Sequence, residues 1–121
     1  LEGRLEFIQG RNCEGADPGS LDAVVSNPPY IASSEVDELP RHILAFEPRT
    51  ALDGGVDGLE ILRSLIHDAT IALKKGGMIF LEIGDRQGVD VQAILEGAGF
   101  SDATILKDFA GKTRYARGRI E

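Results

Sequence analysis

Residues 23–30 read Ala-Val-Val-Ser-Asn-Pro-Pro-Tyr, an apolar run that passes at once into a polar turn. The apolar part predicts a buried strand, which we bound at residues 21–26. A strand that ends in a rigid polar loop is typical of an open α/β sheet, where ligands bind at the carboxyl ends of the strands. The sequence therefore predicts an α/β fold with its chemistry at residues 27–30.

The loop of residues 27–30 offers hydrogen-bond acceptors on a stiff backbone. Asn27 carries a side-chain amide, and Pro28 and Pro29 have no backbone N–H while their rings fix φ. We expect the Asn27 side-chain oxygen and the Pro28 carbonyl to accept hydrogen bonds from a planar NH2 group, with the Tyr30 ring against its plane. Such a nitrogen is a poor nucleophile that gains from being positioned. We therefore predict catalytic roles for Asn27 and Pro28, and substrate binding by all four residues.

The tetrapeptide resembles the catalytic loop of the class I S-adenosylmethionine-dependent methyltransferases that act on amino groups. Further blocks narrow the resemblance to the HemK-type glutamine methyltransferases, which methylate the glutamine of the Gly-Gly-Gln motif in peptide chain release factors. The resemblance implies S-adenosyl-L-methionine as cofactor and a release factor as protein partner. The matching residues, in chain order, are Val25 to Ile31, Phe46-Glu47-Pro48-Arg49, Ala51-Leu52, Gly54-Gly55, Asp57-Gly58-Leu59, Leu81-Glu82-Ile83-Gly84, Gln87, Asp108, Gly111 and Arg114.

The resemblance also implies roles outside the loop. Glu47 is expected to border the glutamine pocket. Arg11 and Asn12 fall where family members place residues beside the adenine ring, and Asn27 is expected to contact the cofactor as well. The family's usual Gly-Asp is here Gly10-Arg11, so either another side chain covers the adenine or the cofactor end of this copy is altered. Structural support is expected for Glu82, whose charge lies inside an apolar strand, and surface or scaffold roles are expected for the matching residues Gln87, Asp108 and Arg114.

The family has an N-terminal helical recognition domain and a glycine-rich cofactor loop, and neither pattern occurs in residues 1–121. The chain is therefore expected to be a partial methyltransferase domain. The resemblance implies the C-terminal half of a Rossmann-like sheet, mostly parallel, with a terminal antiparallel hairpin. A sheet cut in this way exposes an edge and apolar faces, so we expect weak stability or self-association.

Strands and helices alternate along the rest of the chain. Apolar runs predict a strand end at residues 5–9 and a central parallel strand at 78–83, and residues 104–106 and 113–119 predict a closing hairpin. Helical spacing of apolar residues predicts helices over residues 62–73 and 91–98. Gly76-Gly77 and Gly99 are the expected helix ends.

Apolar residues in the connection from residue 31 to residue 57 do not recur at the spacing of a helix or a strand. Only a short helix over residues 34–39 is indicated. A connection of this length is typical of a functional loop or a lid.

Composition limits the function classes. The net charge of −7, from 20 acidic and 13 basic residues, argues against a nucleic-acid groove. Cys13 is the single cysteine, and no apolar run approaches the length of a membrane span or signal sequence. His42 and His67 have no partner at metal-ligand spacing, and no catalytic base is recognisable near Cys13. We expect a cytoplasmic protein with no metal and no membrane or direct nucleic-acid partner.

Two other hypotheses stay open. An adenine amino-methyltransferase acting on DNA or RNA would use the same loop on a flipped base, and would be expected to carry a basic face and more aromatic residues. A non-catalytic fragment of the fold would keep the loop without binding cofactor.

Overall fold

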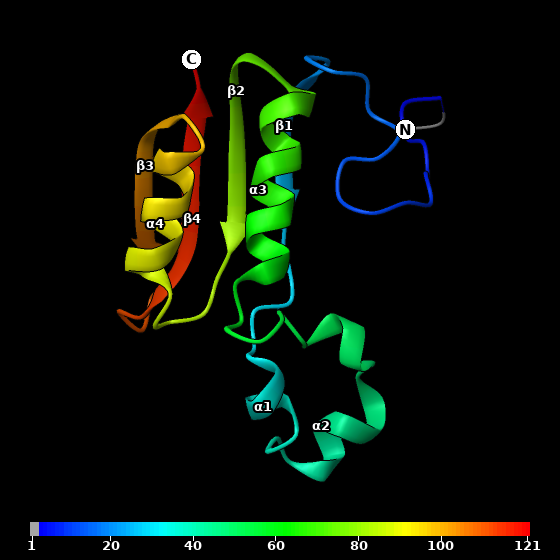
Figure 1. Ribbon diagram of the computed structural model, residues 1–121, viewed down its shortest axis with the longest axis vertical. Coiled ribbons are helices and arrows are strands. Elements are labelled where there is room, and N and C mark those ends of the chain that lie inside the picture. Colours follow the sequence, from blue (N-terminus) through cyan, green and yellow to red (C-terminus); the bar gives the residue numbers. More distant parts are fainter. Residues whose placement is uncertain (1–2) are drawn as a thin grey trace.

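The computed structural model describes residues 3–121 as one four-stranded sheet with helices, in the strand order β1-β2-β4-β3 (Figure 1). The strands are β1 (Leu21–Ser26), β2 (Leu73–Glu82), β3 (Phe100–Lys107) and β4 (Thr113–Ile120). The helices are α1 (Ser33–Val36), α2 (Arg41–Phe46), α3 (Glu60–Ala72) and α4 (Gly88–Gly97), with a 3-10 turn at Arg49–Ala51. The alternation confirms the predicted α/β class.

The sheet is mixed, so the prediction of a mostly parallel sheet is wrong for residues 3–121. Only β1 and β2 run parallel, and β4 is antiparallel to both of its neighbours, β2 and β3. The cause is the predicted hairpin, which is confirmed: the Asp108 N–H donates to the Lys112 carbonyl at 2.8 Å, and the tight turn returns the chain in the opposite direction.

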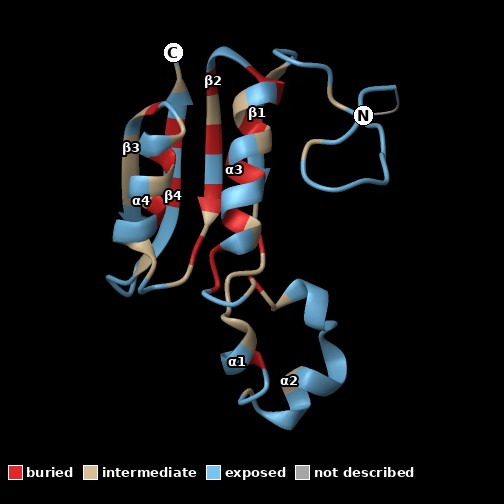
Figure 2. Cartoon of the chain, viewed as in Figure 1, coloured by how far each residue is buried: buried red, intermediate tan, exposed pale blue. Residues whose placement is uncertain are grey.

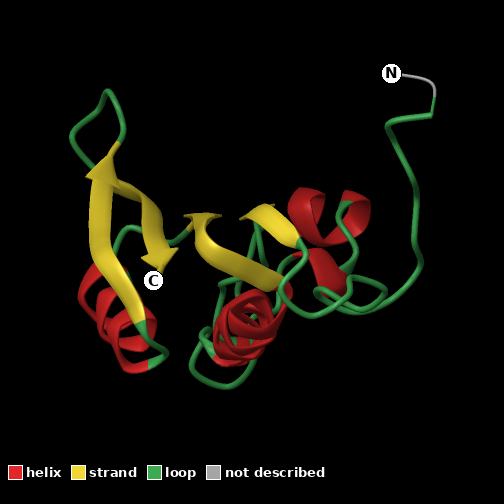
Figure 3. Ribbon diagram, turned by 90° about the horizontal axis from the view of Figure 1, so that it is seen from above, coloured by secondary structure: helices red, strands yellow, loops and turns green. Residues whose placement is uncertain are grey.

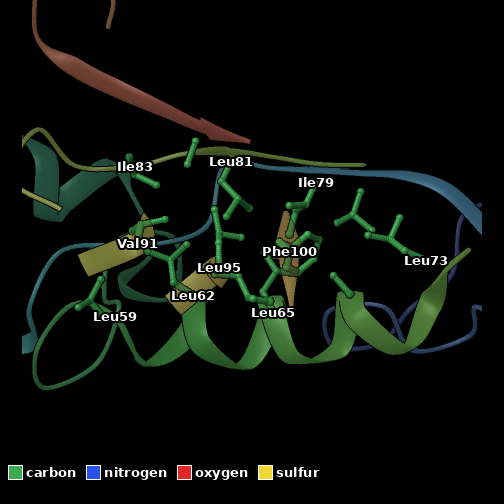
Figure 4. Packing of buried hydrophobic residues seen from close by; sticks show 14 residues of the cluster. Leu59, Leu62, Leu65, Leu73, Ile79, Leu81, Ile83, Val91, Leu95 and Phe100 are labelled. Carbon is green, nitrogen blue, oxygen red and sulfur yellow. The ribbon is translucent and has the colours of Figure 1, made fainter. Parts of the chain in front are cut away.

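Helices α3 and α4 cover one face of the sheet (Figure 3). Helical spacing buries one side of α3, and the alternation of β2 points every second side chain at it. Figure 4 shows the resulting core, in which Leu62 and Leu65 of α3 and Leu95 of α4 meet Ile79 and Leu81 of β2. Leu62, Ile79 and Leu95 are each 0% exposed. This layer fixes the position of the β1 and β2 carboxyl ends.

The opposite face of the sheet is uncovered in residues 3–121, so β1 is not the buried strand that its apolar run predicts. Val24 points into the core and is 9% exposed, whereas Val25 points away and is 76% exposed. Phe80, paired with Val25 across the ladder, and Tyr115 of β4 lie on the same open face at 37% and 43% exposure. They line a shallow cavity of about 400 Å³ that is mostly apolar.

This open face leads to a prediction about residues 1–121 expressed alone. Contiguous exposed apolar surface and a free strand edge favour association. We expect the apparent mass in light scattering to rise with concentration, and Val25→Lys to lower it by placing a charge on the open face. A concentration-independent monomer would contradict the expectation.

Two boundaries differ from their predictions. Residues 5–9 are an exposed loop away from the sheet (Figures 1 and 2). A strand requires a hydrogen-bonded neighbour, and no strand among residues 3–121 pairs with them. Helix α3 ends at Ala72 rather than at Gly76-Gly77, because Leu73 adopts extended angles (φ −75°, ψ 139°) and begins β2 as a buried residue.

The connection from residue 31 to residue 57 lies beyond the carboxyl ends of β1 and β2 (Figure 1). The short helix predicted at 34–39 is present as α1, but α2 was not predicted, because it buries no residue and so leaves no apolar period. Figure 2 shows both helices largely exposed. Within residues 3–121 no helix has the length and apolar character required to cross a bilayer.

Candidate active site

The loop of residues 27–30 begins where β1 ends, beside the end of β2. Ser26 pairs with Leu81 in the parallel ladder, so the two carboxyl ends lie next to each other. Asn27 is exposed and Pro28 is buried. The loop thus projects one side chain from a backbone that the strand holds at one end.

The two predicted acceptors have no hydrogen-bond partner in the described part of the chain. Among residues 3–121, no donor bonds the Asn27 side-chain oxygen or the Pro28 carbonyl. Both residues line a cavity of about 530 Å³ at the strand ends. Tyr30 and Glu47 line the same cavity, so the structure brings together every residue predicted to bind the substrate. The full lining is Asn27, Pro28, Pro29, Tyr30, Ile31, Ile43, Glu47, Ala51, Leu52 and Glu82.

Glu82 also lines the candidate site, although sequence reasoning assigned it first to structural support. It is the last residue of β2 and lines the cavity beside Asn27. Its carboxylate is 28% exposed and lies 3.4 Å from Arg114 Nε. The signal that could have placed Glu82 here is the parallel pairing of two strands that each end in a polar residue, since such ends meet at one edge.

Tyr30 has two roles. Its ring lines the cavity, and it also packs against the hydrophobic core. A Cβ added to Gly84 would lie 3.1 Å from Tyr30 Cδ2, so the ring sits closely over the backbone at the end of β2. The core contact fixes the ring that would flank a bound amide.

The chain after Tyr30 is tied to the loop before α3. Ile31 N–H donates to the Leu52 carbonyl at 3.1 Å, and Gly54 N–H donates to the Ile31 carbonyl at 2.8 Å. Asp53 accepts hydrogen bonds from Ser33 Oγ (2.6 Å), Gly55 N–H (2.9 Å) and Arg49 Nε (3.0 Å). Arg49 also bonds the Asp37 carboxylate at 2.6 Å. These contacts anchor the connection that carries α1 and α2.

The hydrogen bonds at Asp53 predict a pH dependence. The Ser33 hydroxyl first, then the Gly55 N–H and Arg49, lower the pKa of the Asp53 carboxylate. The stabilisation is therefore present above the ordinary Asp pKa of about 3.9 and is lost as the pH falls through the lowered folded value. We expect Asp53→Asn to lower the urea midpoint at pH 6, with the difference from wild type shrinking below pH of about 4.

Asp22→Asn is the matched control, because Asp22 is an exposed carboxylate with an ion pair to Lys74 on the strands. Its urea midpoint should stay close to the wild-type value at pH 6. An equal effect of the two substitutions would contradict the role given to Asp53.

Arg11 and Asn12 lie in a different cavity, of about 600 Å³, which reaches the loop at Pro29. Asn12 Nδ2 donates to Ser64 Oγ at 2.9 Å and to Asp68 Oδ2 at 2.8 Å, so its amide nitrogen hydrogen-bonds to two side chains of α3. Arg11 is exposed. The structure therefore does not bring these two residues into the cavity that Asn27 lines, and their contact with a cofactor stays a prediction.

The site fits the reactive end of S-adenosylmethionine. The 530 Å³ cavity is lined by two carboxylates, Glu47 and Glu82, and by no Lys, Arg or His among the described residues. The Glu82 carboxylate pairs with Arg114, so Glu47, which has no ion pair among residues 3–121, supplies the negative charge that would suit a positively charged sulfonium. No cluster of three or more His, Cys, Asp or Glu side chains able to hold a metal is found in residues 3–121. Burial and the neighbouring Asp68 raise the pKa of the Cys13 thiol, which disfavours the nucleophilic thiolate.

Known proteins match this chain closely. A release factor glutamine methyltransferase from Rhodopirellula baltica is 37% identical over 116 residues, and one from Caulobacter vibrioides is 38% identical over 118. The alignments cover 94% and 98% of this chain but 39% and 41% of those proteins. The chain thus spans about two fifths of their length. No family model matches the chain.

A solved structure gives an independent comparison. The E. cuniculi Mtq2-Trm112 complex, responsible for methylation of the eRF1 translation termination factor, matches with a TM-score of 0.56 at 25% identity. The match covers 84% of this chain and 52% of that one. The sheet and the open strand-end loop define an α/β domain with the fold of the class I methyltransferases. By its sequence, the chain is similar to release factor glutamine methyltransferases over about two fifths of their length.

Proposed function

We propose that this chain carries the catalytic loop of a release factor glutamine methyltransferase, which methylates the side-chain amide of the glutamine in a Gly-Gly-Gln motif. The single observation that supports this most is the pair of open acceptors, the Asn27 side-chain oxygen and the Pro28 carbonyl, in one cavity with Tyr30 and Glu47. The sequence relatives, which carry this activity in their names, support it independently.

The loop acts by orientation. Asn27 and Pro28 each accept one N–H of the glutamine amide, which fixes the direction of the nitrogen lone pair. The same two oxygens stabilise the positive charge that grows on the nitrogen, and the two prolines restrict the backbone that carries them. S-adenosylmethionine, when bound, supplies the electrophilic methyl group. The C–N bond would form as the bond from sulfur to the methyl carbon breaks, with its electron pair left on sulfur as a neutral thioether. No strong base is needed before transfer, and the surplus N–H proton passes afterwards to bulk water.

Neighbouring residues shape the pocket around the amide. Tyr30, held by the core, lies against the amide plane. Glu47 follows directly after α2 and Glu82 ends β2, so each places a carboxylate at the cavity wall. Glu82 is paired with Arg114, so the Glu47 charge is the one that favours a cationic methyl donor over an anionic one.

Mass spectrometry of a release factor after incubation with the full-length protein and S-adenosylmethionine tests this function. A gain of one methyl group on the Gly-Gly-Gln glutamine is expected. Methylated adenine in DNA or RNA, with an unmodified release factor, would move the assignment to an adenine amino-methyltransferase. Calorimetry with S-adenosylmethionine separates both from a non-catalytic fragment, which would show no binding.

A further inference from the structure

The Gln87 side chain joins three separate segments at the catalytic loop. Its Nε2 donates to the Tyr30 carbonyl at 3.0 Å and to the Gly58 carbonyl at 3.3 Å. Its Oε1 accepts the Gly84 N–H at 2.9 Å. The amide therefore connects the loop after β1, the loop before α3 and the end of β2.

This use of Gln87 is not explained by the helix it begins. Gln87 is the N-cap residue of α4, a position where a polar side chain commonly accepts an N–H of the first helical turn. Here the side chain makes no such cap hydrogen bond and turns to the Tyr30 carbonyl instead. The structure uses the amide to hold the loop rather than the helix.

The surrounding backbone leaves little freedom for another arrangement. A Cβ at Gly58 would lie 2.6 Å from the Tyr30 carbonyl oxygen, and one at Gly84 would lie 3.1 Å from Gln87 Oε1. The two glycines let the backbones approach closely enough for one amide to reach all three segments. Gln87 is half-buried there, where an unpaired amide or carbonyl group would be costly.

We infer that Gln87 is a positioning residue for the methyl transfer, a role that rests on the proposed function. The segment from Asn27 to Tyr30 is stiff, because two consecutive prolines fix φ within it. The β1–β2 ladder holds one end at Ser26, and Gln87 holds the other end at the Tyr30 carbonyl. Gln87 thereby fixes the direction of the Pro28 carbonyl and of the Asn27 side chain without touching the substrate amide.

Gln87→Met in the full-length protein tests this role, since it keeps the side-chain length and removes all three hydrogen bonds. Gln92→Met is the matched control: Gln92 Nε2 donates to the Ala103 carbonyl at 3.0 Å, which joins α4 to β3 within the scaffold. We expect Gln87→Met to lower kcat for release-factor methylation about tenfold, with the KM for S-adenosylmethionine changed less than about twofold. Gln92→Met should leave kcat near wild type. Unchanged kcat in Gln87→Met, or equal losses in both variants, would overturn the inference.

Gln87→Glu provides a second variant if Gln87→Met folds poorly. It keeps the acceptor for the Gly84 N–H and replaces the two donors with an oxygen that faces the Tyr30 and Gly58 carbonyls. We expect the same loss of kcat. Wild-type kcat in a folded Gln87→Glu protein would count against the role.

Amide hydrogen exchange separates this inference from the proposed function. The Ile31 N–H belongs to the same peptide group as the Tyr30 carbonyl that Gln87 bonds, and it donates to the Leu52 carbonyl. Its hydrogen exchange therefore reports how firmly the loop is held, without any assay of activity. We expect faster exchange at Ile31 in Gln87→Met than in Gln92→Met. If the wild-type protein methylates no release factor, the proposed function fails. The exchange comparison still shows whether Gln87 holds the loop in position. Equal exchange in the two variants would overturn the inference.

Discussion

We expect Asn27→Ala in the full-length protein to lower kcat for release-factor methylation by about 10²- to 10³-fold, the cost of removing one preorganised electrostatic group from a reacting centre. The side-chain oxygen of Asn27 has no bonding partner among residues 3–121, and Asn27 lines the cavity, so the substitution takes away an unpaired acceptor at the cavity wall. Initial rates of methyl incorporation, measured with labelled S-adenosylmethionine, give the change in kcat.

The fold should survive this substitution, because Asn27 is exposed and contributes nothing to the core. Gln92→Ala, which removes an amide from the scaffold, is the control and should keep its rate within about twofold. Asn27→Asp keeps an acceptor but adds a charge beside the sulfonium and changes the hydrogen-bonding pattern, so we expect a large loss there too. Full activity of either Asn27 variant would contradict the proposed catalysis.

The elements that sequence predicts best are those whose pattern and packing agree. The bounds of β1 match their prediction, and α4 and the hairpin lie within a few residues of theirs, because periodic burial and turn residues mark them together. Gly99, which was expected to stop α4, adopts a φ of +97°, a conformation that favours glycine.

The predictions that failed depend on neighbours that no local pattern contains. The exposure of Val25 follows from the uncovered face of the sheet, and the loop at residues 5–9 follows from the absence of a pairing strand among the described residues. Helix α2 has no buried residue, so its sequence lacks the regular spacing of apolar residues that predicts a helix. Strand direction in the mixed sheet depends on which strand the hairpin pairs with, and this pairing is made by residues far apart in the sequence.

The residues of the candidate site also fall into those that local sequence predicts and those that only the structure shows. Asn27 to Tyr30 were predicted as site residues from the chemistry of adjacent residues, and Glu47 was predicted from a resemblance. Glu82 and Gln87 enter through contacts between distant parts of the chain, such as the Gln87 hydrogen bonds to the Tyr30 and Gly58 carbonyls. A glutamine at the start of a helix gives no sign in sequence of the carbonyl that it will bond.

Gly54→Ala should have the second largest effect, a loss of about 100-fold in kcat, because small displacements of reacting groups are costly. Gly54 is buried, and an added Cβ would lie 2.6 Å from the Gly58 carbonyl oxygen, 2.7 Å from the Pro29 carbonyl oxygen and 2.9 Å from Tyr30 Cα. All three atoms are backbone, so no side-chain rotation relieves the contact. The loop of residues 27–30 must move instead.

Gly97→Ala separates this local displacement from the general effect of replacing glycine. Gly97 lies in α4, where an added Cβ would meet no atom of the described residues within 4 Å beyond its own helix backbone and chain neighbours, and alanine there should stabilise the helix by about 0.5–1 kcal/mol. Gly54→Ala should cost about 1–3 kcal/mol of stability, as overpacking does. Thermal unfolding measures both, and rates taken well below the lower midpoint compare folded proteins. Equal kcat values for the two variants would show that the loop tolerates displacement, and catalysis by rigid orientation would then have to be abandoned.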